Sequence, residues 1–262
     1  MMKRVALVTG ASSGIGKELA RIHASKGGDL VIVARREQAL DDLRHELESE
    51  FSVSVHCIAI DLTSPEAANQ VYDQVSAKGI QVEFLMNNAG FGGHGKFHER
   101  EWDKDRSMIQ LNITVLTELT RLFLPAMVER KRGRILNVAS TAAFIPGPLQ
   151  AVYYATKAYV LSLSQALDEE LRSSNANVTV TALCPGAVAT EFVASSNLEG
   201  NDLWKNAKSP ASVAQVGYEA MMKGKLVAIN EFSLRFMLNW IVPFLPRRTV
   251  LKMSRQSMEK SS

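Results

Sequence analysis

The feature that most constrains the fold of this chain is an alternation of short apolar runs with helix-length amphipathic segments, which continues almost to its end. Few charges interrupt the apolar runs, as expected of parallel strands that are covered by helices on both faces. Strands are predicted at residues 4–9, 29–34, 53–60, 84–87, 134–139, 178–183 and 226–229. Helices are predicted at residues 15–26, 38–50, 65–77, 102–129, 153–172 and 211–222. The alternation predicts an α/β fold with one doubly wound sheet and right-handed crossovers.

The chain is long enough for one α/β domain or two small ones, and nothing in it marks a boundary. Its 262 residues include 46% hydrophobic and 22% charged residues, proportions that are ordinary for a soluble globular enzyme. No linker rich in proline or serine, internal repeat or low-complexity segment divides the sequence. We therefore expect a single domain over residues 1–262.

The charge balance and the cysteines argue against several classes of protein. The 30 basic and 27 acidic residues are interspersed and give a net charge of only +3, so no concentrated basic face for nucleic acid is expected. Cys57 and Cys184 lie far apart without metal-ligand spacing, which argues against a disulfide framework or a metal site and fits a reducing compartment. The N-terminal apolar run is too short for a signal peptide, and no run approaches the roughly 18 apolar residues of a membrane span. We expect a cytoplasmic protein without a transmembrane segment.

Residues 230–262 depart from the strand–helix alternation. Residues 236–246 are mostly apolar, and four basic residues follow, namely Arg247, Arg248, Lys252 and Arg255. A lid over the site or a contact between subunits is the simpler interpretation of this extension. A peripheral contact with a membrane surface is the alternative, because an apolar stretch beside basic residues suits such an interface.

A glycine-rich turn lies between the first predicted strand and the first predicted helix. Its glycines follow a Gly-x3-Gly-x-Gly spacing, which differs from the Gly-x-Gly-x-x-Gly of the better-known dinucleotide fingerprint. Glycine is needed here because the chain turns sharply and approaches a pyrophosphate closely, while the helix N-terminus offers free amides. The candidate cofactor residues of the turn are Gly10, Ser12, Ser13, Gly14, Ile15 and Gly16. A purely structural turn is the alternative.

The end of the second predicted strand indicates which dinucleotide is bound. A site for NAD(H) usually carries an acidic residue there to hold the ribose 2′-hydroxyl. This chain has Arg35 and Arg36 instead. A guanidinium can bind a 2′-phosphate through two hydrogen bonds, so the pattern favours NADP(H) over NAD(H). Two solvated arginines with Glu37 beside them are the alternative.

Two further segments end at the same edge of the predicted sheet, where open α/β folds bind their ligands. Asp61 and Leu62 follow the third strand, and Asp61 is placed either to meet the adenine edge or to cap the next helix. Asn88, Ala89 and Gly90 follow the fourth strand, and these small and amide residues suit close packing against a cofactor. A simple turn is the alternative for the second segment.

Tyr153 and Lys157 are the strongest catalytic pair in the sequence. They lie four residues apart on a predicted helix and therefore share a face. A nearby positive charge favours the phenolate, so we expect Lys157 to lower the pKa of Tyr153 from about 10. Such a tyrosine can donate a proton to a carbonyl oxygen or accept one from an alcohol near neutral pH. Tyr154 has Ala158 at the same spacing and is the weaker candidate, and Tyr-x3-Lys is also common by chance.

Two polar residues are candidates to complete this site. Ser140 ends the fifth predicted strand, and a loop from there can bring its hydroxyl over the start of the next helix, although Thr141 is a rival. Asn112 lies in an apolar stretch of the long helix and needs a hydrogen-bonding partner. A satisfied core asparagine is one interpretation, and a water-mediated link to Lys157 is the other.

As a set, these motifs resemble the short-chain dehydrogenases/reductases over about residues 3–230. Thr-Gly-x3-Gly-x-Gly, Asn-Asn-Ala-Gly, an asparagine in the long helix, a serine, Tyr-x3-Lys and a late Pro-Gly occur in the family's order. The resemblance implies a Rossmann-like sheet of seven parallel strands with helices on both faces. It also implies a dimer or tetramer whose subunits meet through the two long helices. Residues that it places beside the nicotinamide are Pro185, Gly186, Val188 and Thr190.

The resemblance also implies a catalytic tetrad of Asn112, Ser140, Tyr153 and Lys157. Tyr153 would be the acid/base, and Lys157 would bind the nicotinamide ribose and tune Tyr153. Ser140 would hold the carbonyl oxygen, and Asn112 would keep a proton-relay water in place. Members that use NADP(H) often carry a basic residue just after the second strand, as Arg35 does here, and many carry another where this chain has Ser13. The cofactor assignment therefore depends on the first feature alone.

These observations predict an oxidoreductase that transfers a hydride between NADP(H) and a carbonyl or secondary alcohol. The expected pocket residues suggest an apolar ketone, aldehyde or 3-oxoacyl compound, and they are Phe91, His94, Phe144, Leu149 and Phe192. A loop histidine without a catalytic role is the simpler interpretation of His94. A non-catalytic NADP(H)-binding sensor or scaffold is the alternative function, although such a protein has no need of Tyr153 and Lys157 together. A sugar-nucleotide epimerase is disfavoured by the glycine spacing and the short chain.

Overall fold

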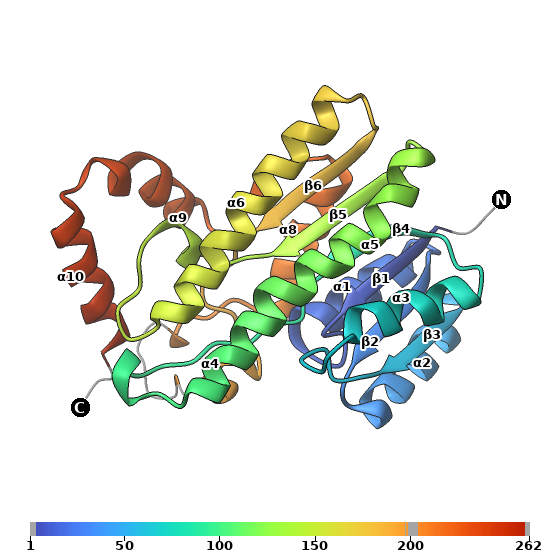
Figure 1. Cartoon of the computed structure of the whole chain (residues 1–262), viewed down its shortest axis with the longest axis horizontal. Helices are drawn as coiled ribbons and strands as arrows, with labels where there is room; N and C mark the ends of the chain where they lie inside the picture. Colours follow the sequence, from blue (N-terminus) through green and yellow to red (C-terminus); the bar gives the residue numbers. More distant parts are fainter. Residues whose placement is uncertain (1–3, 197, 199–203, 260–262) are drawn as a thin grey trace.

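The computed structural model describes residues 4–196, 198 and 204–259. Its centre is a seven-stranded parallel sheet in the order β3-β2-β1-β4-β5-β6-β7 (Figure 1). The strands are β1 (Val5–Thr9), β2 (Asp29–Ala34), β3 (Val55–Ala59), β4 (Val82–Asn87), β5 (Gly133–Val138), β6 (Val178–Leu183) and β7 (Val227–Ala228). The predicted seven-stranded, doubly wound sheet is therefore confirmed, with strand ends that shift by no more than two residues.

Helices cover both faces of the sheet because successive side chains of each strand point to opposite sides. Ala6 and Val8 of β1 pack with α1, α2 and α8, while Leu7 between them packs with α3 and α5. The helices that match the sequence expectation are α1 (Gly14–Ser25), α2 (Glu37–Phe51), α3 (Ala67–Ala77), α6 (Ala151–Ser173) and α8 (Pro210–Met222). The two layers hold the carboxyl ends of the strands in a fixed arrangement.

The predicted helix at residues 102–129 is confirmed as one continuous helix, but it is not α-helical throughout. The structure divides it into α4 (Trp102–Ile109), a π-helical turn (Gln110–Val115) and α5 (Leu116–Glu129). By length and composition alone Trp102–Glu129 could cross a membrane, contrary to the sequence expectation. Its α5 part, however, packs into the core against the sheet. One extra residue per turn widens a π-helix, and such turns are frequent at functional sites.

Helix α3 begins two residues later than expected because the backbone of Glu66 is left-handed, with φ of +59°. Asp61 does not cap this helix. Its Oδ1 accepts hydrogen bonds from the backbone N and the hydroxyl of Thr63, at 2.9 and 2.8 Å, and so closes a local turn.

The C-terminal extension folds back on the body at the end of the molecule opposite β3 (Figure 1). It contains α9 (Phe232–Phe236), a π-helical turn (Met237–Ile241), a 3-10 turn (Val242–Phe244) and α10 (Arg247–Met258). Val250, Ser254 and Met258 are spaced four residues apart and form the buried stripe of α10. His94 Nε2 lies 2.8 Å from the carbonyl oxygen of Met258, which joins the end of α10 to the loop after β4.

Candidate active site

The predicted site residues gather at the carboxyl edge of the sheet, around the point where the strand order reverses between β1 and β4. Ligands of open α/β sheets bind in the crevice at such a point. The glycine turn, the β4–α4 loop, the β5 end, the start of α6 and the loop after β6 all reach this edge (Figure 1).

The glycine turn has a backbone that other residues could not adopt. Gly10 and Gly14 have φ of +65° and +55°, and a side chain on Gly16 would place its Cβ 2.2 Å from the carbonyl oxygen of Gly10. The close approach of the start of α1 to the end of β1 therefore requires these glycines. Ile15 packs its side chain against the core on the α1 side of the sheet and anchors the turn.

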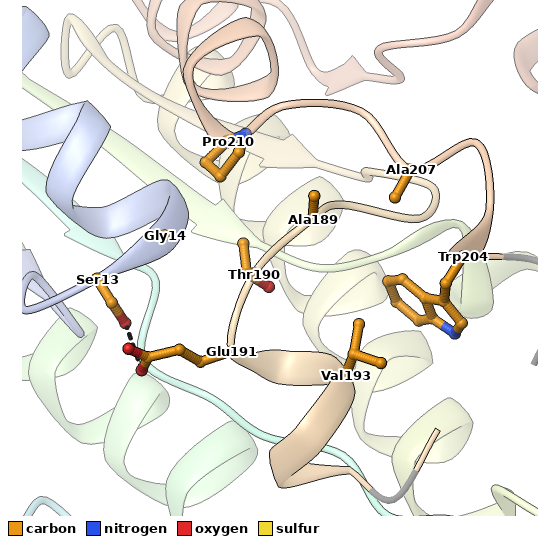
Figure 2. Close-up of a pocket in the computed structure, with 9 residues that line it drawn as sticks. All are labelled: Ser13, Gly14, Ala189, Thr190, Glu191, Val193, Trp204, Ala207 and Pro210. Atoms are coloured by element: carbon orange, nitrogen blue, oxygen red, sulfur yellow. Dashed lines mark hydrogen bonds between the residues drawn. The ribbon is translucent and has the colours of Figure 1, made fainter. Parts of the chain in front are cut away.

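The N-terminus of α1 fits a dinucleotide pyrophosphate. The first amides of a helix have no intrahelical acceptor and carry a partial positive charge. The side chain of the N-cap residue, Ser13, makes no capping hydrogen bond to them. Its hydroxyl donates instead to Glu191 Oε2, at 3.1 Å (Figure 2).

Of the two arginines after β2, Arg36 is the one that reaches the glycine turn. Its Nη2 donates to Ser12 Oγ at 3.1 Å and lies 3.0 Å from Glu191 Oε2, while its Nη1 donates to Glu191 Oε1 at 3.1 Å. The hydrogen bonds from Arg36, the largest cause, hold the pKa of Glu191 below its usual range. Arg35 instead contributes its charge near Asp61, whose pKa is lowered because the hydrogen bonds from Thr63 and this charge outweigh burial.

Glu191 is a functional candidate that the sequence analysis missed. Its carboxylate binds Arg36 and Ser13, two of the residues expected to hold cofactor phosphates, and a carboxylate offers acceptors of the same kind as a phosphate. It borders a cavity of about 610 Å³ between the start of α1 and the segment after β6 (Figure 2). An acidic residue next to Thr190, one of the predicted cofactor residues, is the only sequence feature that could have drawn attention to it.

The segment after β4 fastens the glycine turn to the middle of the sheet. Thr9 Oγ1 accepts from the backbone N of Asn88 and of Ala89, both at 3.0 Å. Asn88 Nδ2 donates to the carbonyl oxygens of Thr9 and Gly10, at 2.9 and 3.2 Å. Thr9, which the sequence analysis did not name as a site residue, therefore fixes the distance between the two loops. Leu62, another predicted cofactor residue, is buried in the core on the α3 side of the sheet.

Ser140, Tyr153 and Lys157 lie together and are all buried. Ser140 Oγ accepts from the backbone N of Ala142 at 3.1 Å, and its hydroxyl acts on the Tyr153 phenol to lower the pKa of that phenol. Lys157 Nζ donates to the carbonyl oxygen of Val138 at 2.8 Å and lies 5.8 Å from the centre of the Tyr153 ring. The expected convergence of these three side chains is present in the structure.

The expected lowering of the Tyr153 pKa is not present. Burial raises the pKa of this phenol above its usual range, and the Ser140 hydroxyl offsets only part of the effect. Burial also lowers the pKa of Lys157 to about 8. Both shifts have one cause, because a site closed to water disfavours the charged form of each group.

Asn112 lies in the π-helical turn and is fully partnered by the protein. Its Oδ1 accepts from the backbone N of Phe91 at 3.2 Å, and its Nδ2 donates to the carbonyl oxygen of Phe91 and to Thr156 Oγ1, at 2.9 and 3.1 Å. A Cβ on Gly90 would lie 2.9 Å from Asn112 Oδ1 and 3.5 Å from Lys157 Nζ. Asn112 and Lys157 thus approach the same glycine, without a hydrogen bond to each other.

The segment after β6 closes the site from the other side. The carbonyl oxygen of Pro185 accepts from Ser140 Oγ at 3.4 Å, and the backbone N of Gly186 donates to Asn230 Oδ1 at 3.2 Å. Val188 is buried. A Cβ on Gly14 would lie 3.0 Å from the methyl carbon of Thr190. This segment therefore meets both the serine and the glycine turn.

Aromatic side chains surround the Tyr153 phenol on the substrate side. The ring of Phe192 lies 5.4 Å from that of Tyr153, and Phe91 packs in the same cluster. Phe144 borders a second cavity, of about 510 Å³, whose other walls belong to the C-terminal extension. Leu149 lies in the loop before α6, and its carbonyl oxygen accepts from Gly95 N at 2.8 Å.

A glycine turn at the reversal point of a parallel sheet, beside a buried serine, tyrosine and lysine, defines a dinucleotide-dependent oxidoreductase. Residues 4–201 match the model of the short chain dehydrogenase family, and the chain belongs to that family. Very-long-chain 3-oxoacyl-CoA reductase of Macaca fascicularis is 30% identical over 263 residues, which cover 98% of this chain and 80% of that protein. The human protein of the same name is 36% identical over 193 residues, 71% of this chain and 60% of that protein.

Solved structures agree with the family assignment. A short-chain dehydrogenase from Sphingobium yanoikuyae, in complex with NADPH, superposes with a TM-score of 0.84 at 32% identity and covers 92% of each chain. A bulky-bulky ketone specific alcohol dehydrogenase from Comamonas testosteroni superposes with a TM-score of 0.78 at 27% identity and covers 94% of this chain and 96% of that chain. The Rossmann-like fold predicted from the family resemblance is confirmed.

Proposed function

We propose that this protein is an NADP(H)-dependent carbonyl reductase that acts on an apolar ketone, aldehyde or 3-oxoacyl compound and also catalyses the reverse oxidation of the alcohol. The observation that carries the proposal is the joint burial of Ser140, Tyr153 and Lys157 beside the glycine turn. A purely structural cluster does not require a tyrosine, a lysine and a serine to share one buried site.

Each catalytic side chain has a role that follows from its position. The bound nicotinamide supplies or accepts the hydride. Tyr153 donates its phenolic proton to the carbonyl oxygen, and its raised pKa keeps that proton available at neutral pH. Ser140 orients the same oxygen through its hydroxyl. Lys157, with a pKa of about 8, is mainly cationic at neutral pH and stabilises negative charge that develops on Tyr153.

Asn112 is a positioning residue in this proposal. Its side chain ties the π-helical turn to Phe91 and so fixes the loop that carries Gly90. Asn112 Oδ1 and Lys157 Nζ both approach Gly90, and we propose that a water at this glycine links the two groups. A relay of protons from Lys157 toward solvent at this point is part of the proposal.

The cofactor is held at the outer part of the site. The first amides of α1 would hold the pyrophosphate, and Arg36, with Ser12 and Ser13, would hold the 2′-phosphate. The charge of Arg35 acts on Asp61 and would add positive potential at the adenosine end. Relatives support the choice of NADP(H), because the Sphingobium yanoikuyae structure is a complex with NADPH.

The substrate class is inferred from the pocket walls and from the relatives. Phe91 and Phe192 pack in the cluster that contains Tyr153 and give the substrate side an aromatic lining. The names of two relatives describe a very-long-chain 3-oxoacyl-CoA and a bulky-bulky ketone, both large carbonyl compounds. We propose a large apolar substituent next to the reacting carbonyl, a cytoplasmic location, and a homodimer or homotetramer whose subunits meet through α4, α5 and α6.

The test is NADPH consumption with purified full-length protein and a panel of bulky ketones, aldehydes and 3-oxoacyl thioesters. Turnover of at least one bulky carbonyl compound, abolished in Tyr153→Phe, supports the proposal. Tight NADPH binding without turnover of any panel member, unchanged in Tyr153→Phe, contradicts it and favours a sensor or scaffold.

A further inference from the structure

The C-terminal foot, residues 232–258, presents an unusual number of large apolar side chains to solvent. Phe232, Trp240 and Phe244 are 82%, 68% and 81% exposed, and Phe236 and Ile241 are also exposed. Phe232 and Phe236 lie four residues apart and therefore on one side of α9. Exposed apolar patches of this kind mark interaction surfaces.

The foot is held to the body by a different set of side chains. Leu238, Val250 and Met258 are buried, and His94 contacts the end of α10. The foot is therefore packed against the body through other residues, and its aromatic side chains are not needed for that packing. They remain outside after the foot has docked, at the end of the molecule opposite β3 (Figure 1).

The foot region also carries the positive charge of the whole chain. Residues 230–262 contain six basic and two acidic residues, whereas residues 1–229 contain 24 basic and 25 acidic ones. Arg235, Arg247, Arg248 and Lys252 are exposed, and none of them is paired with a carboxylate within the described part of the chain. The foot lies beyond residue 201, where the match to the family model ends.

We propose that the foot binds the surface of an anionic lipid bilayer, with its aromatic side chains in the headgroup region and its basic side chains on the lipid phosphates. Trp240 favours this region because its indole has an apolar body and a polar N–H, while the exposed phenylalanines can bury apolar surface at the boundary between headgroups and acyl chains. Basic residues near an anionic membrane are attracted by its negative surface potential. This proposal does not depend on the proposed reaction.

A second copy of this chain fits the same surface less well. In a two-fold symmetric dimer the same patch meets itself, so Arg247 and Arg248 of both copies would approach each other. Like charges brought together at an interface are unfavourable, and the cores of protein interfaces are depleted in charged residues. An anionic bilayer surface can accommodate the aromatic side chains in its headgroup region and pair its phosphates with the basic side chains.

The test is co-sedimentation of the full-length protein with vesicles of phosphatidylcholine alone or mixed with phosphatidylglycerol. We expect binding to the anionic vesicles to be at least tenfold stronger and to weaken as salt is added. The triple variant Phe232→Ser/Trp240→Ser/Phe244→Ser and the charge variant Arg247→Glu/Arg248→Glu are each expected to lose at least tenfold in affinity. The matched control is Phe97→Ser/Trp102→Ser, which removes exposed aromatic residues elsewhere and leaves binding unchanged.

Trp240 provides an independent measurement. In a Trp102→Phe/Trp204→Phe background, its fluorescence is expected to shift to the blue with anionic vesicles only. Thermal unfolding confirms that each variant is folded. Equal losses in the foot and control variants overturn the proposal. The proposal is also overturned if wild type does not bind vesicles but forms a dimer, and the triple variant is a monomer. That result would assign the foot to subunit contact.

Discussion

Ser140, Tyr153 and Lys157 are each at least nine-tenths buried, whereas the Arg36 and Glu191 side chains, at the same edge of the sheet, are 50% and 64% exposed. The buried cluster is held by hydrogen bonds to the carbonyl oxygens of Val138 and Pro185, which belong to the β5 and β6 ends. We call Arg36 and Glu191 the rim of the site. An ion pair between their side chains holds the rim together. Buried polar groups are costly to separate, but an exposed ion pair contributes only about 0–1 kcal/mol.

The difference separates the two parts of the proposed reaction. A fixed cluster suits proton transfer, because the donor must lie in place before the substrate arrives. A weak, exchangeable ion pair suits cofactor entry, because a phosphate can replace the Glu191 carboxylate on Arg36 at little energetic cost. Substitutions in the cluster should therefore change turnover or stability strongly, and those in the rim should change cofactor affinity mildly.

The largest expected effect is on turnover in Tyr153→Phe. Loss of the proton donor is expected to lower kcat by at least about 100-fold, the usual contribution of general acid catalysis, and to leave NADPH affinity nearly unchanged. Steady-state kinetics and calorimetry measure the two effects. Tyr154→Phe is the matched control, because Tyr154 lies against Ser254 of α10 rather than Ser140, and it should change kcat only slightly. If kcat falls equally in Tyr153→Phe and Tyr154→Phe, the buried cluster has no special role in turnover.

The second effect is a pH dependence of stability that originates in Lys157. Its folded-state pKa of about 8 lies below the ordinary 10.5, so the unfolded chain binds more protons between these values. Stability contributed by this group therefore rises as pH increases from about 8 toward 10.5, and the burial penalty is fully present below 8. We expect the unfolding free energy of wild type, measured in urea and compared with Lys157→Met, to improve by up to a few kcal/mol over this window.

The comparison with Lys157→Met is needed because other groups titrate nearby. Burial raises the pKa of Cys57 to about 11 and of Cys184 to about 12, and it also raises the pKa of Tyr153. The contribution of these three groups to the free energy of unfolding therefore falls as pH rises. Cys57 and Tyr153 contribute similarly to both proteins and largely cancel, whereas Cys184 is coupled to the charge of Lys157 and is replaced by alanine in both proteins. A difference that is flat between pH 7 and 10 would show that Lys157 is not buried as a cation.

The third effect concerns the glycine turn, which joins the two regions. Gly16→Ala forces a Cβ toward the Gly10 carbonyl oxygen, and such overpacking costs about 1–3 kcal/mol. We expect NADPH affinity to fall at least tenfold. Gly27→Ala is the control, because Gly27 has φ of +75° and open space around it, away from the site. It should lower the melting temperature without weakening NADPH binding. Unaltered NADPH affinity in Gly16→Ala would contradict the assignment of the turn.

The smallest expected effect is in Glu191→Gln. Removing the carboxylate frees Arg36 and Ser13, and the modest energy of an exposed ion pair corresponds to a gain of up to about fivefold in NADPH affinity. NADH binding should not change, because NADH has no 2′-phosphate. Glu37→Gln removes a neighbouring exposed carboxylate and serves as the control. A loss of NADPH affinity in Glu191→Gln would mean that Glu191 helps to hold the cofactor.

The regular parts of the fold were predictable from sequence because each strand and its covering helix carry their own apolar pattern. The Tyr153–Lys157 pair and the glycine turn were predictable because they depend on spacing within one or two adjacent elements. The π-helical turn at Asn112 was not, since it is set by hydrogen bonds to Phe91, a residue of another loop. Glu191 was missed for the same reason, because its partners lie 155 residues away or more along the chain.

The direction of the Tyr153 pKa shift was also predicted wrongly. Helical spacing shows that Lys157 faces the same way, but it does not show how completely the two groups are removed from water. In the structure the lysine donates to the Val138 carbonyl oxygen, and burial dominates both groups. Burial depends on the loops after β5 and β6, which no local pattern encodes.

The most direct test of the account is a calorimetric titration of wild type, Arg36→Ala and Arg35→Ala with NADPH and with NADH. We expect wild type to prefer NADPH by at least about tenfold, or about 1.4 kcal/mol. Arg36→Ala should lose this preference, and Arg35→Ala should keep most of it, because only Arg36 reaches Ser12 and Glu191. Equal binding of NADH and NADPH by wild type would contradict the assignment of the rim as a 2′-phosphate site.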